Sequence, residues 1–363
     1  MSTDCQAYVA TALQPGAIGI MQLIGDVEPV LNAVTGRANW PVGRMRLANL
    51  AGIDEGLAVR LAPTVAQLMP HGGPRVMQRV TAHLASLGVE LVNFDDPSVD
   101  PMQQYPEAED EFEALMLRAL ARAQSSLAID LLLDQPRRWR ELLAVGGNLS
   151  EEDRRRSTRL MRLIDPPMVV LAGLPNVGKS TVSNALLGRA MSIELDQPGT
   201  TRDYTMGLID LAGLTVRWHD TPGIRDSDDP IEQRSIGIAR KLIERADLLI
   251  AMRDANEGAD VWPELPREPD LRIVNKCDLI ENVSQKPRLT SRPAPLGLRQ
   301  ETSARKTGVT RDSIPMRISA RTGSGLVDLV AVIRDRIVPP DDLADPGPWL
   351  FDDRLLPLAA SRR

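Results

Sequence analysis

Residues 173–180 constrain the fold more than any other part of the chain, because they have the pattern Gly-x4-Gly-Lys-Ser. The apolar run 168–172 before them predicts a strand, and the run 181–187 after them predicts a helix. In such a unit the glycines let backbone N–H groups curl around a phosphate, the lysine reaches phosphate oxygens and the serine hydroxyl can bind Mg²⁺. The segment therefore predicts a phosphate-binding loop (P-loop) in an α/β domain.

Three later segments complete a nucleotide site. The sequence Asp-Thr-Pro-Gly occupies 220–223, where Asp220 can hold Mg²⁺ through water and the Gly223 N–H can contact a γ-phosphate. The sequence Asn-Lys-Cys-Asp occupies 275–278, and the carboxylate of Asp278 can accept hydrogen bonds from the guanine N1–H and exocyclic amine. Adenine does not offer this pair of donors, so the motif indicates GTP rather than ATP. Residues 319–321, Ser-Ala-Arg, would supply backbone for the guanine carbonyl.

The segment 198–203, Pro-Gly-Thr-Thr-Arg-Asp, lies between the first predicted helix and a predicted hairpin. Its threonine hydroxyls and carbonyls could reach Mg²⁺ and the γ-phosphate, and we expect it to order around the triphosphate. The residue after Gly223 is Ile224, whereas Ras-type enzymes orient the attacking water with a glutamine. Hydrolysis must therefore be arranged differently, and a carboxylate is the obvious substitute.

Four regions follow from turn residues and apolar periodicity. Residues 1–95 predict an α+β domain that includes a helix over 75–87, and 96–165 predict a linker and a reduced helical domain. In the latter, apolar residues from 112 to 131 at spacings of three and four predict one helix of about seven turns, and Ser150 predicts the N-cap of a second helix that ends at 163. Residues 166–338 predict a mainly parallel sheet covered by helices on both faces, with an antiparallel hairpin at 205–219 on one edge. The prolines after residue 338 predict an extended tail over 339–363.

Composition limits the partners. The chain has 363 residues and a net charge of -6, so no general positive field is available for nucleic acid; we expect no DNA partner, and any RNA contact must be local. Two cysteines are too few for a disulfide framework. No basic leader and no apolar run of about 18 residues is present, so we expect a cytoplasmic protein without a membrane partner.

These motifs resemble the tRNA-modification GTPase family called TrmE or MnmE. In that family the P-loop carries an asparagine at the position of Asn176, the following segment has Gly-Thr-Thr-Arg-Asp as at 199–203, and a glutamate lies twelve residues beyond the aspartate of the Asp-Thr-x-Gly motif, here Glu232. Residues 235–240 are similar to the family's Gly-Ile-Glu-Arg-Ala-Arg run. Residues 14–25 and Pro-His-Gly-Gly-Pro at 70–74 are similar to its N-terminal segments.

The resemblance implies roles for these residues. A K⁺ ion would be bound by Asn176, Thr200 and main-chain oxygens near Leu195 and Gln197, and would stabilise charge on the phosphates. Mg²⁺ would be held by Ser180 and Thr201, with Asp220 acting through water. Glu232 would position the attacking water, with Lys179, Thr201 and Gly223 also catalytic. The expected contacts to GTP or GDP are Gly173, Asn176, Val177, Gly178, Lys179, Ser180, Thr181, Leu195, Asp196, Gln197, Pro198, Gly199, Thr200, Thr201, Asp220, Thr221, Pro222, Gly223, Asn275, Lys276, Asp278, Ser319, Ala320 and Arg321.

Two of these residues also have simpler interpretations. Glu232, with Asp228 and Asp229, suits a solvated helix N-terminus. Asn176 could be a hydrogen-bonding residue of the loop.

The resemblance further implies a homodimer through the N-terminal domain, a folate bound there, and a flavoprotein partner in modification of the tRNA wobble uridine. The chain departs from the family at three points: the arginine before Ile-Ser-Gly is Gln22, the Pro-Gly-Glu-Phe and Asn-Gly-Lys elements are missing, and 351–363 have no Cys-x-Gly-Lys motif. Several folate contacts are therefore lost. Three functions stay open: a K⁺-dependent GTPase in tRNA modification, a reduced switch acting as a regulatory or assembly factor, and a GTP-stabilised scaffold, against which the retained hydrolytic residues argue.

Overall fold

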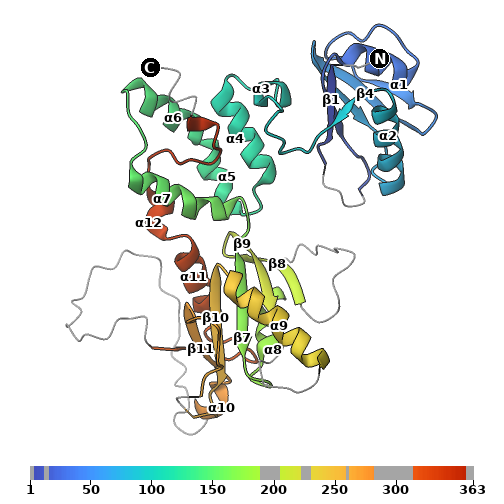
Figure 1. Ribbon diagram of the computed structural model, residues 1–363. Coiled ribbons are helices and arrows are strands. Elements are labelled where there is room, and N and C mark those ends of the chain that lie inside the picture. The colour runs from blue at the N-terminus through green and yellow to red at the C-terminus, as the bar shows by residue number, and fades with distance from the viewer. Residues whose placement is uncertain are drawn as a thin grey trace, which may run out of the picture. The chain divides into compact units, whose positions relative to one another are not determined.

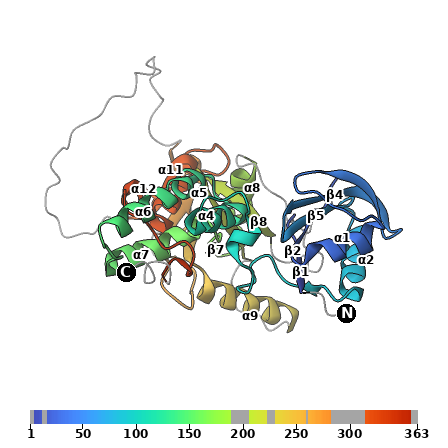
Figure 2. The same cartoon turned by 90° about the horizontal axis from the view of Figure 1, so that it is seen from above.

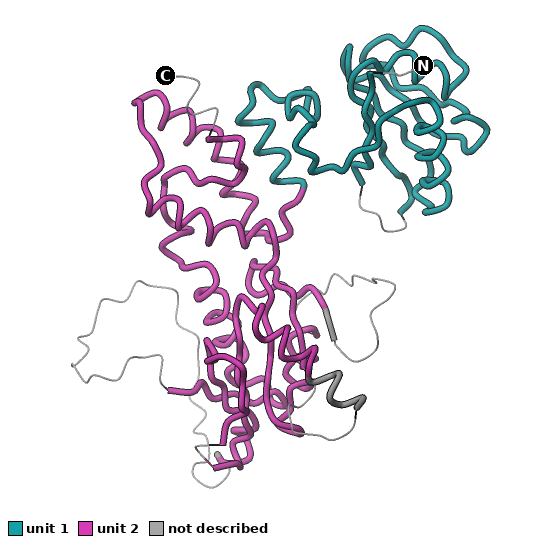
Figure 3. Tube along the Cα trace, viewed as in Figure 1, with its two compact units in different colours: residues 1–121 teal, residues 122–363 magenta. Residues whose placement is uncertain are grey.

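The structure is a computed structural model that describes residues 4–11, 16–188, 205–221, 230–258, 261–281 and 314–356. Of residues 205, 206, 230–236 and 281 only the backbone is described. The chain forms two compact units, Met1–Ala121 and Arg122–Arg363 (Figure 3). No helix within the described ranges is long and apolar enough to cross a membrane.

The first unit contains a six-stranded, mainly antiparallel sheet in the order β3-β4-β5-β2-β1-β6. Side chains that alternate along its strands separate two faces. One face, with Ala7 and Leu23, shares a core with two helices, and the other, with Tyr8 and Ile24, packs on Val99. The elements of this α+β fold are β1 (Cys5–Val9), β2 (Met21–Gly25), α1 (Val27–Thr35), β3 (Arg46–Leu50), β4 (Asp54–Ala62), β5 (Val65–Met69), α2 (Pro74–Ser86) and β6 (Glu90–Leu91).

Residues 94–106, which include the start of the region predicted from residue 96 as a linker and reduced helical domain, pack on the sheet, so the linker prediction is wrong for this stretch. The ring of Phe94 meets Tyr8 edge to face at 5.7 Å, and the Gln22 side chain donates to the Gln104 carbonyl at 2.7 Å. The short helix α3 (Pro101–Gln104) has its proline in the first turn, where the missing N–H costs no helical hydrogen bond. The prolines therefore shape a packed segment.

The predicted seven-turn helix is also wrong, because it is broken into α4 (Glu111–Arg122) and α5 (Ser126–Leu133). At the break the Ser125 hydroxyl accepts a hydrogen bond from the Thr215 N–H at 3.0 Å, and the Gln124 carbonyl accepts one from the Thr215 hydroxyl at 2.8 Å. These contacts with the hairpin of β8 (Thr205–Leu211) and β9 (Leu214–Asp220) replace helical hydrogen bonds. The helix predicted after Ser150 is confirmed as α7 (Glu151–Leu160) with a capping box, followed by the 3-10 turn Met161–Leu163. Between α5 and α7 lies α6 (Gln135–Ala144).

The second unit contains the predicted mainly parallel sheet, in the order β12-β11-β10-β7-β9-β8. The β8–β9 hairpin forms the predicted antiparallel edge, and the other neighbouring strands are parallel. Figures 1 and 2 show α9 on one face of the sheet and α8 and α11 on the other. The elements are β7 (Met168–Gly173), α8 (Lys179–Leu187), β8 (Thr205–Leu211), β9 (Leu214–Asp220), α9 (Pro230–Arg245), β10 (Leu248–Asp254), β11 (Leu271–Asn275), α10 (Asp278–Glu281), β12 (Met316–Arg317) and α11 (Leu326–Ile337).

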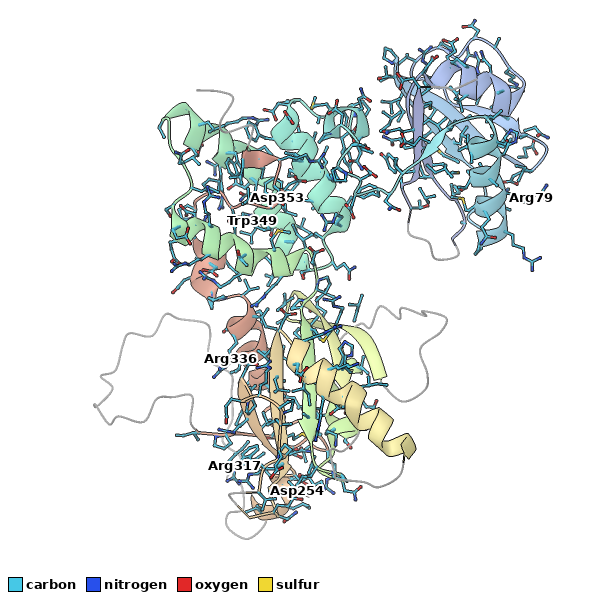
Figure 4. All side chains as sticks on the ribbon, viewed as in Figure 1. Arg79, Asp254, Arg317, Arg336, Trp349 and Asp353 are labelled. Atoms are coloured by element: carbon cyan, nitrogen blue, oxygen red, sulfur yellow. The ribbon has the colours of Figure 1, made fainter. Side chains whose placement is uncertain are left out.

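The chain after α11 is packed rather than extended, which corrects the predicted tail over residues 339–356. It forms the short helix α12 (Pro340–Ala344) and then buries Trp349, Phe351 and Leu355. Figure 4 shows Trp349 among the helices that precede the sheet in sequence. Its N–H donates to the Gln135 side chain at 2.9 Å, and its carbonyl accepts from the Trp139 indole at 3.1 Å. The segment thus completes the core of α6 and α7, because those helices are too few to bury their apolar faces alone.

Candidate nucleotide-binding site

The P-loop connects the end of β7 at Gly173 to the start of α8 at Lys179. Two of its residues have positive φ, Asn176 at 65° and Gly178 at 96°. A Cβ atom on Gly178 would lie 2.6 Å from the Asn275 side-chain nitrogen, so a larger residue would displace Asn275 and would be strained at this φ. The loop therefore has the backbone of a tight turn that leads into α8, whose first N–H groups have no partner within the helix and are suited to an anion.

Lys179 lies inside this loop. It is buried, and its ammonium group donates to the carbonyls of Gly173 at 3.0 Å and Leu174 at 2.9 Å. Burial lowers the pKa of Lys179, and the nearby carboxylate of Asp220 opposes that shift. The side chain is thus placed to exchange carbonyl contacts for phosphate oxygens.

Asp220 ends β9 next to the P-loop. Burial raises its pKa, while hydrogen bonding to Ser180 and the charge of Lys179 lower it. Its Oδ1 atom is buried and has no hydrogen-bond partner among the described residues. Thr221 fixes this strand end, because its hydroxyl donates to the Leu171 carbonyl of β7 at 2.9 Å. A buried carboxylate oxygen without a donor, beside a serine hydroxyl, fits a hydrated Mg²⁺ ion.

The loop after β11, residues 275–278, is joined to the P-loop by two side chains. Asn275 donates from Nδ2 to the Val177 carbonyl at 3.0 Å. Lys276 donates from Nζ to the Asn176 carbonyl at 2.7 Å and forms an ion pair of 2.7 Å with Asp254. Hydrogen bonds therefore fix the loop that is predicted to select the base against the loop that is predicted to hold the phosphates.

Asp278 receives donors from the segment after β12. The Ser319 hydroxyl donates to its Oδ1 at 2.6 Å, and the Arg321 guanidinium donates to its Oδ2 at 2.6 and 3.1 Å. These hydrogen bonds lower the pKa of Asp278, with Ser319 the larger cause. The Ala320 N–H, expected to contact the guanine carbonyl, donates to the Asn275 side chain at 3.1 Å. The three segments are thus brought together around an ionised carboxylate.

Comparison with known proteins agrees with this geometry. Residues 168–290 match the family described as 50S ribosome-binding GTPase. The chain is 30% identical over 379 residues to the tRNA modification GTPase MnmE of Methylococcus capsulatus, with 90% of this chain and 80% of that protein covered. It is also 30% identical over 341 residues to MnmE of Thiobacillus denitrificans, with 79% and 76% covered. The chain belongs to the MnmE family of tRNA modification GTPases.

Membership of the MnmE family confirms the predicted resemblance, the P-loop GTPase fold and the activity: the protein is a GTP hydrolase that binds GTP and GDP with Mg²⁺. Among solved structures, Era of Aquifex aeolicus bound to GDP and AlF4⁻ is 25% identical over 51% of this chain and 59% of its own, with a TM-score of 0.31. The family assignment rests on the MnmE relatives.

The sequence motifs of the MnmE family did not indicate Asp254, which fixes Lys276. Figure 4 shows Asp254 at the end of the sheet where this site lies. Its loop is braced by Arg253, which donates to the carbonyls of Glu257 and Gly258 and lies 5.3 Å from the ring centroid of Trp262. In the sequence, the one feature that could have indicated Asp254 is its position shortly after an apolar run that predicts a strand.

Several expected ligands fall outside the described residues: Leu195, Asp196, Gln197, Pro198, Gly199, Thr200, Thr201, Pro222 and Gly223. The backbone of Glu232 lies in the first turn of α9, but its side chain is not among those described. The roles of all these residues remain predictions.

In the first unit, the two segments that resemble the N-terminal domain of the MnmE family lie side by side. The Gly19 N–H donates to the Pro70 carbonyl at 2.9 Å, and the Gly72 N–H donates to the Ala17 carbonyl at 3.2 Å. A Cβ atom on Gly72 would lie 2.5 Å from the Gly16 carbonyl oxygen, so the glycine permits this close approach. His71 donates its backbone N–H to Asp54 at 2.8 Å, and its ring contacts the same carboxylate. This supports a structural role for His71.

Proposed function

We propose that this protein hydrolyses GTP with the assistance of K⁺ and that its nucleotide cycle serves modification of the tRNA wobble uridine. The supporting observation is the state of the Asn176 side chain in the P-loop. Its main-chain carbonyl is taken by Lys276, while its exposed side-chain amide has no hydrogen-bond partner among the described residues. The positive φ of 65° suits asparagine, but that preference alone does not require a ligand.

The residues of the chain divide the work of hydrolysis. Lys179 and the N-terminus of α8 bind the phosphates, and Asp278 selects guanine. Ser180, Thr201 and water-mediated Asp220 would hold Mg²⁺, and Asn176, Thr200 and the carbonyls near Leu195 and Gln197 would hold K⁺. Both cations, when bound, would supply positive charge where negative charge develops on the transferred phosphate. Glu232 orients the attacking water, in place of the glutamine that is absent after Gly223.

The cation mechanism is tested by hydrolysis of GTP in matched KCl and NaCl. We expect faster turnover in K⁺, and we expect Asn176→Gly, which tolerates the positive φ, to lose that preference while GDP binding is retained. Asn176→Asp keeps a side-chain oxygen and serves as the conservative variant. Equal wild-type rates in the two salts would refute K⁺ assistance.

The role of Glu232 is tested in the same assay. Glu232→Ala should lower turnover about 10²-fold or more without weakening GDP binding, because it removes water orientation and leaves the phosphate site intact. Glu244→Ala removes an exposed carboxylate further along α9 and is the matched control. Comparable turnover in the two variants would leave Glu232 as a helix-start carboxylate.

The family relationship supports a homodimer through the first unit, a flavoprotein partner and a cytoplasmic location as parts of this proposal. A reduced switch without modification chemistry is the second candidate, and Gln22 favours it. Where the family has an arginine, the amide of Gln22 donates to the Gln104 carbonyl at 2.7 Å and accepts from Gln67 at 3.0 Å. The hydrogen bonds of this side chain are therefore made within its own domain, and they are not available to a folate. If the content of modified wobble uridine in tRNA is unchanged after removal of the protein, the second candidate is selected.

A further inference from the structure

A cavity of about 620 Å³ lies within the second unit, and it is distinct from the residues that are expected to bind GTP. It is bordered by the start of α5, the β8–β9 hairpin, the end of α8 and one side of α11. None of its lining residues belongs to the expected GTP site. Its volume is in the range of about 300–1,000 Å³ that is typical of small-molecule sites.

The walls of the cavity are mainly aliphatic. Ile129 on α5 and Val327 on α11 line it while remaining 45% and 71% exposed. Covering such side chains is favourable by about 25 cal/mol for each Å² of apolar surface removed from water. The branched aliphatic wall residues are Ile129, Leu186, Leu208, Leu211, Leu326, Val327 and Val330.

Hydrogen bonds hold the walls in place without a ligand. The hairpin and the start of α5 are joined by Thr215 N–H to the Ser125 hydroxyl at 3.0 Å and by Leu127 N–H to the Gly213 carbonyl at 3.1 Å. A Cβ atom on Gly213 would lie 2.8 Å from a Leu127 side-chain atom, so the two elements are in direct contact. The cavity is therefore formed in advance of binding, which lowers the entropic cost of taking up a ligand.

The charge of the cavity lining is negative. Among the described residues that line the cavity, Asp210 is the single ionisable group. Its Oδ1 accepts a hydrogen bond from the Gly213 N–H at 2.8 Å, and within the described residues the carboxylate forms no ion pair. Asp210 is exposed at the border of the cavity, so its carboxylate can attract a ligand that carries a positive charge or an N–H donor, whereas an anion would be repelled.

We propose that this cavity binds a small, mainly apolar amine, with the apolar body against α5, α8 and α11 and the ammonium group toward Asp210. The volume selects a ligand of one or two rings, the walls select an apolar body, and the lone carboxylate selects the charge. This inference does not depend on the K⁺ mechanism, because it uses no residue of the nucleotide site.

The probe is 1-naphthylmethylamine, which is protonated at neutral pH, and 1-naphthylacetate is its anionic counterpart. Titration of the full-length protein by fluorescence anisotropy should show saturable binding of the amine, about fivefold tighter than the acetate, as expected for a partly exposed charge. Asp210→Asn keeps an acceptor for the Gly213 N–H and should abolish this preference. No saturable amine binding, or equal binding of both probes by the wild type, would overturn the proposal.

A second pair of variants locates the probe. Ile129→Arg places a bulky cation at an exposed wall residue and should reduce amine binding at least about fivefold through crowding and like charge. Leu133→Arg makes the same change one turn later on α5, at a residue that is 53% exposed and outside the lining, and should bind as the wild type does. GDP affinity and thermal stability, measured in parallel, confirm that both variants are folded. Equal binding by the two folded variants would place the probe elsewhere and refute the site.

Discussion

Replacement of Trp349 by alanine tests whether the chain after α11 is part of the folded second unit. Trp349 is 1% exposed and meets Phe351 edge to face, with 5.8 Å between ring centroids. Its main-chain hydrogen bonds to Gln135 and Trp139 can survive the substitution, so the loss is one of packing. Core substitutions of this kind cost about 3–5 kcal/mol.

The size of the effect on melting follows from the size of the unit. For about 150–250 residues, each kcal/mol corresponds to about 2–4 °C. We therefore expect Trp349→Ala to lower the melting temperature of the nucleotide-free protein by about 10 °C in scanning calorimetry.

Trp262→Ala is the matched control, because Trp262 is only partly buried and contacts Arg253 and Arg272 at 5.3 and 5.7 Å from its ring centroid. Its two cation–π contacts are worth about 0.5–1 kcal/mol each when exposed, so a shift of about 2–8 °C is expected. If Trp349→Ala shifted the melting temperature no more than Trp262→Ala, the tail would be extended in solution, as the prolines predict, and the packing argument would be refuted.

The remaining predictions concern the nucleotide site. Asp278→Asn should change the GTP-to-XTP affinity ratio about tenfold or more in favour of XTP, because an amide can donate to the xanthine C2 carbonyl; an unchanged ratio in competition titrations would contradict base recognition by Asp278. Gly178→Ala should abolish GDP binding measured by calorimetry, since the added methyl would meet Asn275 at 2.6 Å. Because the pKa of Asp220 is raised in the folded protein, the protonated carboxyl stabilises the fold at pH values below its ordinary pKa of 3.8. This stabilisation is lost as the pH rises through the raised pKa. At pH 7.5, Asp220→Asn should therefore raise the melting temperature of the nucleotide-free protein and weaken binding of Mg²⁺·GTP; a lower melting temperature would contradict the cost of the buried charge.

Local motifs predicted the centre of the fold well, because their geometry is set by residues close in sequence. The strand before Gly173, the helix from Lys179 and the capping box at Ser150 all depend on neighbours within about one turn. The mainly parallel sheet was also predicted, since buried parallel strands are short, continuous apolar runs.

The errors have a common physical cause, namely contacts between residues far apart in sequence. Ser125 interrupts the predicted long helix because Thr215, 90 residues later, donates to its hydroxyl. The tail packs because Trp349 reaches Gln135, 214 residues earlier. Prolines and serines marked places where regular structure stops, but they did not show whether the following chain enters solvent or a core.

The ties between residues 275–278 and the P-loop mean that base recognition and phosphate binding are not independent in this protein. Lys276 joins the Asn176 carbonyl to Asp254, and Asn275 joins the Val177 carbonyl to the Ala320 N–H. A shift of either loop would therefore move the other, and it would also move the Asn176 side chain that we propose as a K⁺ ligand. If guanine is held by Asp278 in the same segment, as we propose, occupation of the base site should favour the P-loop geometry needed for the cation. On this proposal, selection of GTP and assembly of the hydrolytic centre are two consequences of one set of contacts.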